Sequence, residues 1–290
     1  MDTIIQSWLL FLNLKKLYLC AMPKNALKLT LLVLIMALIA GCSKYQRVFK
    51  STDNELKYET AIALYEKKDY YRALQLFDQL MPVFKGTERE EKMSYFYAYS
   101  YYYQKDYMLA GYYFKRFATS YPVSKYAEEC YFMNAYCSYL NSPPVSLDQT
   151  SSVEAIKEFQ AFINKYPASD KLDRSNELID KLRLKLEEKA YNIANMYLHM
   201  DEYLSAVVSY KTLMQEFPDT RFREEAMYNI IKAYHFYAVN SIDEKRIERH
   251  RQAINAYNDF KALYPESKLM KQATDLIQSS IKQVKKEDNS

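Results

Sequence analysis

One apolar pattern recurs five times along this chain of 290 residues. Each copy starts at an alanine and places an apolar or aromatic residue four, seven and eleven positions later, and in four copies a proline follows. At about 100° per residue these offsets share one narrow stripe of a helix, so each copy predicts a helix with one buried face. The first alanines of the five copies are Ala73, Ala110, Ala155, Ala206 and Ala253.

A second alanine precedes each copy by 12 or 20 residues, at Ala61, Ala98, Ala135, Ala194 and Ala233. Two small residues twelve positions apart, with an aromatic-rich first helix and a second helix that ends at proline, resemble the tetratricopeptide repeat. The resemblance implies that the first helix of each pair, helix A, and the second, helix B, pack closely at these positions. Residues 268–285 form a further amphipathic segment that would cover the last pair. We therefore expect an all-α fold, a right-handed α-solenoid of about five tetratricopeptide-like helix pairs with a C-terminal capping helix.

The spacing of the alanines also divides the chain into parts. Repeats three and five each carry eight extra residues. In repeat three the insertion contains 141–144 and the polar run 150–152, and this composition predicts a surface loop. In repeat five the insertion contains 242–249, which predicts an extended helix B. Repeat four has no Gly or Pro between 168 and 217, so residues 172–199 predict one helix of about 40 Å. The expected parts are a signal region at 1–41, a lipidated tether at 42–53, repeats one and two at 54–122, repeat three with its loop at 123–167, repeat four with its long helix at 168–218, repeat five at 219–265, and a capping helix with a polar tail at 266–290.

Three glycines stand against thirty tyrosines. Gly41, Gly86 and Gly111 lie too far apart to form a dinucleotide-binding or phosphate-binding loop. The three histidines have no metal-ligand spacing. We therefore expect no catalytic residue, no metal site and no enzymatic activity.

The N-terminal region has the features of a secretory signal. A basic segment at 22–28 precedes an apolar run at 29–39, which is too short to span a bilayer. The sequence Leu-Ile-Ala-Gly-Cys at 38–42 resembles a bacterial lipobox, which implies diacylglycerol and an N-acyl chain on Cys42 and no other cofactor. The alternative for Cys42 is an ordinary cysteine after a signal anchor. Residues 1–21 fit no signal pattern, so we expect translation to start at Met22.

Removal of the signal region leaves a nearly neutral chain. Residues 1–41 hold four of the 40 basic residues and one of the 36 acidic residues. Nucleic-acid binding needs a clustered basic face, so no nucleic-acid partner is expected. Cys130 and Cys137 lie seven residues apart in a helical stretch, about 10 Å along the axis, which is too far for a disulfide. We expect both to be buried free thiols.

Hydroxyl residues recur two positions after the prolines, where we expect them to cap the next helix. Acid pairs such as Glu128–Glu129 and Glu224–Glu225 follow, and their position favours interaction with the helix dipole over a role as paired general acids. The four predicted capping residues are Ser124, Ser169, Thr220 and Ser267.

The first helices of repeats one to three predict an aromatic groove, because helix A of each pair supplies most of the concave surface in such a solenoid. Tyrosine offers apolar area and a hydroxyl at a low ordering cost, so this surface suits an extended peptide with bulky side chains. We expect about half of these rings to pack against the next helix instead. The candidate peptide-binding residues are Tyr58, Tyr65, Tyr95, Tyr99, Tyr102, Phe132, Tyr136 and Tyr139.

A lipobox followed by a chain that five such repeats almost fill resembles the BamD family, outer-membrane lipoproteins of the β-barrel assembly machinery. The resemblance covers residues 42 to about 285. It implies a lipid-anchored, periplasm-facing scaffold at the outer membrane of a Gram-negative bacterium. The implied partners are BamA, the other subunits of the machinery and unfolded outer-membrane β-barrel proteins. The resemblance implies that the C-terminal repeats hold the periplasmic domains of BamA. It also implies that the N-terminal repeats receive the aromatic-rich C-terminal signals of the unfolded barrel proteins. The charged residues expected on the BamA-facing rim, or alternatively on a merely solvated face, are Arg221, Arg223, Glu244, Arg246, Arg249 and Arg251.

Two other functions remain open from the sequence. The first is a periplasmic tetratricopeptide lipoprotein that coordinates envelope or cell-wall processes. The second is a lipid-anchored glycan-binding protein, although such chains are usually much longer. The one tryptophan, Trp8, precedes Cys42, so the mature chain lacks the usual sugar-stacking residue.

Overall fold

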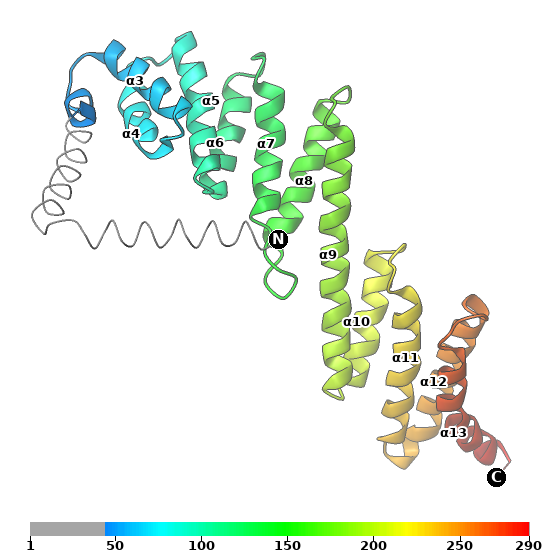
Figure 1. The fold of residues 1–290 in the computed structure, drawn as a ribbon. Coiled ribbons are helices and arrows are strands. Elements are labelled where there is room, and N and C mark those ends of the chain that lie inside the picture. The colour runs from blue at the N-terminus through cyan, green and yellow to red at the C-terminus, as the bar shows by residue number, and fades with distance from the viewer. Residues whose placement is uncertain (1–43, 290) are drawn as a thin grey trace, which may run out of the picture. The chain divides into compact units, whose positions relative to one another are not determined.

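The computed structural model describes residues 44–289, and all regular structure within them is helical (Figure 1). The chain divides into two compact units between Lys105 and Asp106. The first unit contains α3 (Asn54–Glu66), α4 (Tyr70–Leu80) and α5 (Glu88–Tyr103). The second contains α6 (Tyr107–Ser120), α7 (Ala127–Leu140), α8 (Thr150–Lys165), α9 (Leu172–His199), α10 (Tyr203–Glu216), α11 (Arg223–Val239), α12 (Asp243–Leu263) and α13 (Met270–Asp288). The all-α prediction is confirmed, whereas the signal region and Cys42 lie outside the described residues.

The alanines of the repeat pattern lie where helices pack against each other. All ten are fully buried, including Ala61 and Ala73 in the first unit and Ala194 and Ala206 in the second. Neighbouring helices in the sequence contact each other, α3 with α4 in the first unit and α7 with α8, α9 with α10 and α11 with α12 in the second. A larger side chain at these positions would hold the helices apart, so the recurrence of alanine follows from close packing.

Four of the second helices of the pairs end in the same way. Tyr121, Tyr166, Phe217 and Tyr264 each donate the backbone N–H to the carbonyl four residues earlier, at 2.8–2.9 Å, and each has φ between −125° and −132°. A proline follows each of them, and the residue before proline is excluded from the helical region. In repeat one, which lacks this proline, α4 already ends at Leu80, so the expectation that Phe84 lies in the helix is wrong.

The hydroxyl residues after the prolines stabilise turns and do not occupy the helix N-cap. Ser124 Oγ accepts from the N–H of Tyr126 at 3.1 Å, and it is Tyr126 that precedes the first residue of α7. Ser169, Thr220 and Ser267 make the equivalent bond to the residue two positions later. The capping prediction is therefore wrong by two residues, because one extra turn separates the proline from the next helix. The acid pairs do lie in the first turns of α7 and α11, as predicted.

The two insertions differ as their composition suggests. In repeat five, α12 starts at Asp243 and includes all the inserted residues except Ile242, which precedes its first residue. In repeat three the loop covers only 141–149, because Thr150–Ser152 form the first turn of α8, which corrects the assignment of this polar run to the loop. The loop is attached to α9: Lys185 Nζ donates to the carbonyl of Pro143 at 3.0 Å, and Lys189 Nζ donates to that of Leu147. The long helix α9 covers the residues expected for it.

Three turns between helices A and B use non-glycine residues in the left-handed conformation. Lys68, Lys105 and Asp201 have φ of 62°, 64° and 60°. Such positions after a helix C-terminus usually hold glycine, because an L-residue there is strained. The shortage of glycine therefore extends to turns that would favour it.

Both described cysteines are free and buried, as predicted. Burial raises the pKa of the Cys137 thiol to about 12 and raises that of Cys130 as well. Gly111 on α6 lies against the same part of α7, since a Cβ on Gly111 would come within 3.2 Å of the Cβ of Cys137. These small residues allow α6 and α7 to approach closely.

Helix α13 packs on both α11 and α12. Its Ala273 and Ile277 are fully buried against Ile231 and Phe260. This helix covers the apolar face that the last repeat would otherwise expose, as expected of a capping helix.

Candidate functional site

A set of contacting aromatic rings connects α3, α4 and α5 of the first unit. Tyr65 on α3 lies 4.4 Å from Phe96 on α5, measured between ring centroids, and 5.6 Å from Tyr70 on α4. Tyr70 in turn stacks on Tyr103 at 4.8 Å. On α5, Tyr99 lies 4.8 Å from Tyr95 and 6.1 Å from Tyr102. We call this set the aromatic cluster, and its members are Tyr65, Tyr70, Tyr95, Phe96, Tyr99, Tyr102 and Tyr103.

Helical periodicity explains how one helix supplies so many of these rings. Tyr95, Tyr99 and Tyr103 are spaced by four residues and therefore follow one side of α5. Tyr102 was predicted from the sequence as a groove residue and Tyr103 was not, although Tyr99 and Tyr103 lie 5.8 Å apart in the structure. The four-residue spacing was the signal that could have identified it.

The cluster is part of the packing and part of the surface. Tyr99 is only 8% exposed, whereas Tyr103 is 48% exposed. Burial and the neighbouring Tyr103 raise the pKa of the Tyr70 hydroxyl, which like any tyrosine hydroxyl is protonated at neutral pH and can donate a hydrogen bond. The cluster thus combines a rigid aromatic base with accessible ring area and hydroxyl donors, which suits contact with aromatic side chains of a peptide.

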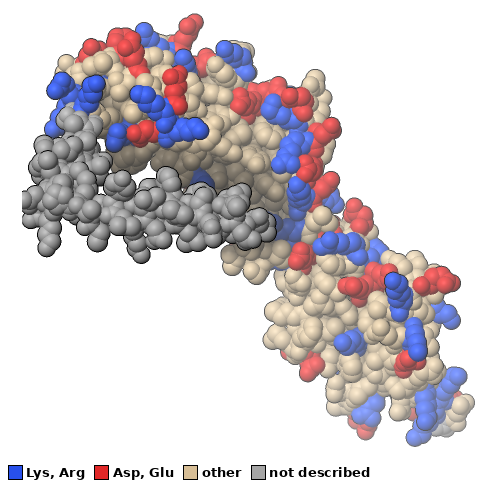
Figure 2. Space-filling model, viewed as in Figure 1, with Lys and Arg blue, Asp and Glu red and all other residues tan. Residues whose placement is uncertain are grey.

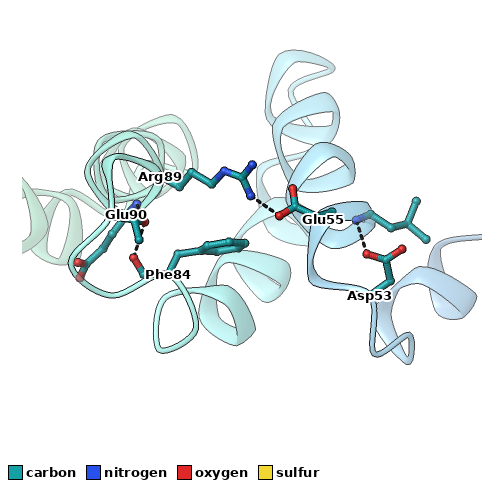
Figure 3. A network of polar contacts seen from close by, with 7 residues as sticks. Asp53, Glu55, Phe84, Arg89 and Glu90 are labelled. Atoms are coloured by element: carbon teal, nitrogen blue, oxygen red, sulfur yellow. Dashed lines mark hydrogen bonds and ion pairs between the residues drawn. The ribbon is translucent and has the colours of Figure 1, made fainter.

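Tyr58 lies apart from the cluster, in a contact that includes a cation. The Arg89 guanidinium carbon lies 5.2 Å from the ring centroids of both Tyr58 and Phe84, and the two rings are 5.8 Å apart. Arg89 also pairs with Glu55 on α3, as Figure 3 shows. Glu90, beside it, accepts from the N–H of Gly86 at 2.6 Å. This arrangement ties the start of α5 to α3, and Arg89 was not among the residues predicted from the sequence.

The three candidate residues on α7 belong to the second unit and also form a stack. Phe132 and Tyr136 have centroids 6.0 Å apart and planes within 12°, and Tyr136 and Tyr139 are 5.9 Å apart and within 13°. Phe132 packs on Phe159 of α8 at 5.9 Å. All three rings are half-buried against the hydrophobic core of α7, α8 and α9. The candidate groove residues therefore form one set in each unit, with Tyr58 separate from both.

Three of the six predicted rim charges of repeats four and five bind their own repeat. Arg223 Nη2 donates to the carbonyl of Pro218 at 2.6 Å, beyond the end of α10. Arg246 Nη2 donates to the carbonyl of Ser241 at 2.9 Å, and its Nη1 pairs with Asp243 at 2.6 Å. The guanidinium of Arg249 lies 3.7 Å from the centroid of the Tyr237 ring. Their guanidinium groups are thus engaged within the chain.

The other three rim residues are exposed. Arg251 pairs with Asp288 of α13 at 2.6 Å. Arg221 lies over the ring of Phe222 at 4.7 Å, and Glu244 makes no ion pair within the described part of the chain. Arg221 and Glu244 are therefore the charges most available to a partner. On the face drawn in Figure 2, basic and acidic side chains are interspersed and form no extended basic patch.

Among residues 44–289, no group of three or more His, Cys, Asp and Glu side chains could hold a metal ion. Within the same residues, every helix falls short of the length and apolar content that crossing a membrane requires.

Comparison with known proteins gives consistent matches. A family model described as YfiO, outer membrane lipoprotein, matches residues 50–250. The putative outer membrane protein assembly factor BamD of Aquifex aeolicus is 28% identical over 231 residues, which cover 79% of this chain and 74% of that protein. The outer membrane protein assembly factor BamD of Caulobacter vibrioides is 23% identical, over 70% of this chain and 68% of that protein. The one of Rickettsia prowazekii is 22% identical, over 87% of this chain and 96% of that protein.

Proposed function

This chain belongs to the YfiO family of outer membrane lipoproteins, and from that membership we propose that it is a non-enzymatic, periplasm-facing scaffold in the assembly of outer-membrane β-barrel proteins. The location at the outer membrane follows from the family. The assembly role is supported by the curated relatives, which are outer membrane protein assembly factors. The scaffold has three tasks, which are anchoring, reception of the unfolded barrel protein and attachment to BamA.

Anchoring rests on Cys42. The lipobox at 38–42 supports cleavage before this cysteine and attachment of diacylglycerol and an N-acyl chain to it. Several acyl chains on one cysteine give stable membrane attachment, which a single acyl chain does not. Cys42→Ala should therefore leave the chain without lipid and with its signal region uncleaved, whereas intact-mass measurement of the wild-type chain should show a chain that begins at Cys42 and carries the added lipid.

Reception of the substrate is assigned to the aromatic cluster and to the aromatic stack on α7. The observation that carries this assignment is the exposed ring of Tyr103 in contact with the half-buried ring of Tyr70 and the buried ring of Tyr99. A C-terminal signal rich in aromatic residues can gain ring contacts there without ordering the receiving side chains, since these are already held by their neighbours.

A peptide-binding experiment tests this assignment. Tyr103→Ala should weaken binding of a synthetic peptide with the aromatic C-terminal strand of a barrel protein by about tenfold, which corresponds to about 1.4 kcal/mol. Tyr71→Ala is the matched control, because Tyr71 is a more exposed tyrosine, at 66%, on α4. If both variants bind the peptide like the wild type by fluorescence anisotropy, the substrate binds elsewhere.

Attachment to the periplasmic domains of BamA is assigned to repeats four and five. Arg221 and Glu244 support this assignment because they are exposed charges in these repeats. Reversal of both charges, Arg221→Glu with Glu244→Arg, should reduce co-purification of BamA, while Arg116→Glu, an exposed arginine on α6, should leave it unchanged. Retention of BamA by the double reversal would place the interface on another surface. Co-purification of cell-wall enzymes without a barrel protein would favour the envelope-coordinating alternative.

A further inference from the structure

Three buried polar side chains from three different helices meet under the capping helix. The Nδ1 atoms of His235 on α11 and His250 on α12 each lie 2.9 Å from Oγ of Ser280 on α13. Ser280 is 0%, His250 2% and His235 7% exposed. The two histidines are 15 residues apart in the sequence and Ser280 lies 30 residues beyond His250, so no local motif indicated this contact.

The contact keeps both hydrogen bonds only while the ring that accepts from Ser280 is neutral. A serine hydroxyl has one proton, so it donates to one imidazole nitrogen and accepts the N–H of the other ring. A protonated imidazole has only donors, so the ring that accepts from Ser280 would lose its hydrogen bond on protonation. The new cation would also be buried, away from water. We propose that His235, His250 and Ser280 form an acid-sensitive latch that releases α13 from α11 and α12 when the imidazoles take up protons.

The surroundings oppose protonation in the closed state. Burial lowers the pKa of both histidines, and neighbouring His235 and Arg246 lower the pKa of His250 further. On α12, Arg246 is itself paired with Asp243, while α13 contributes the uncharged Ser280. Since each closed-state pKa lies below the ordinary value near 6.5, the closed state binds fewer protons than the released state, and its stability falls as pH falls below about 6.5.

Two further polar contacts join α13 to α12, and neither contains a histidine. Tyr257 OH and Thr274 Oγ1 lie 3.0 Å apart, and Arg251 Nη2 pairs with Asp288 Oδ1 at 2.6 Å. Release of α13 would uncover the apolar side chains of Ile231 and Phe260, which it now covers. The latch would therefore couple acidification to exposure of an apolar face on the last repeat.

Hydrogen exchange of the full chain in detergent solution tests the latch. Protection factors of the α13 amides, corrected for the intrinsic effect of pH on exchange, should fall between pH 7.5 and 5.5 by about tenfold if one imidazole controls release and by up to about 100-fold if both do. Amides of α7, which carries no histidine, should keep their protection. A fall of less than about fivefold in α13, or an equal fall in α7, would overturn the proposal.

Variants separate the latch from general acid sensitivity. His235→Gln with His250→Gln should abolish the pH dependence of α13, whereas His199→Gln should retain it, because His199 is exposed on α9. If the double variant loses helicity at pH 7.5, the two single variants decide, and each should show a smaller fall than the wild type. A wild-type fall in every variant would refute the latch.

Discussion

Arg249 gives the sharpest test of which charges in repeat five are structural. Its guanidinium lies 3.7 Å from the Tyr237 ring centroid and donates to Oγ of Ser241. A half-buried cation–π contact contributes about 1 kcal/mol, and a hydrogen bond from a charged donor about 1.5 kcal/mol. Allowing for overlap between the two, Arg249→Ala should lower the free energy of unfolding by about 2 kcal/mol. For a unit of this size that corresponds to a fall in Tm of about 4–8 °C.

Thermal unfolding followed by circular dichroism measures this effect, and two variants calibrate it. Arg249→Lys keeps the charge and loses the planar stacking, so about half of the loss should remain. Arg221→Ala, at an exposed position, should change the free energy of unfolding by less than about 0.5 kcal/mol. An Arg249→Ala variant that unfolds like the wild type but no longer retains BamA would refute the reasoning, because Arg249 would then serve the partner and not its own repeat.

Three further predictions concern a turn, the thiols and the insertion loop. Lys68→Gly should raise the stability of the first unit by about 0.5–1 kcal/mol in urea denaturation, because glycine adopts φ of 62° without strain; a loss of stability would contradict the strained-turn account. Because burial raises the pKa of both Cys130 and Cys137, neither thiol should react with iodoacetamide at pH 8 until the chain is denatured, and native labelling within minutes would show that they are accessible. Lys185→Met removes the charged donor that holds the loop carbonyls, so chymotrypsin should cleave after the exposed Leu147 about tenfold faster; unchanged cleavage would mean that the loop is held by other contacts.

The helices could be predicted because their signals are local. The apolar stripe and the proline define four of the five second helices within a dozen residues, and all ten alanines of the pattern are buried. Predictions from local composition were wrong where the same residues suit two different local structures. Thr150–Ser152 is polar enough for a loop but equally suits the first turn of a helix, and Ser124 can accept an N–H from a turn as well as from a helix end.

The candidate sites could be predicted only in part, because side-chain partners depend on packing between helices. Four predicted residues do belong to the aromatic cluster: Tyr65, Tyr95, Tyr99 and Tyr102. The place of Tyr103 in the cluster could not be predicted in the same way, because it depends on the stacking of Tyr103 on Tyr70 of α4. Arginines such as Arg223 look available in the sequence because their carbonyl acceptors are backbone groups, which no residue pattern displays. The contact of two histidines with Ser280 requires three helices to be in place.

The central claim is that the chain is a component of the machinery that assembles outer-membrane β-barrel proteins. Isolation of the full chain from membranes under native conditions, followed by mass spectrometry of the bound proteins, tests it most directly. We predict that a large outer-membrane β-barrel protein with periplasmic domains is recovered in a constant ratio to the chain. Recovery of peptidoglycan enzymes in its place, with no barrel protein, would contradict the claim.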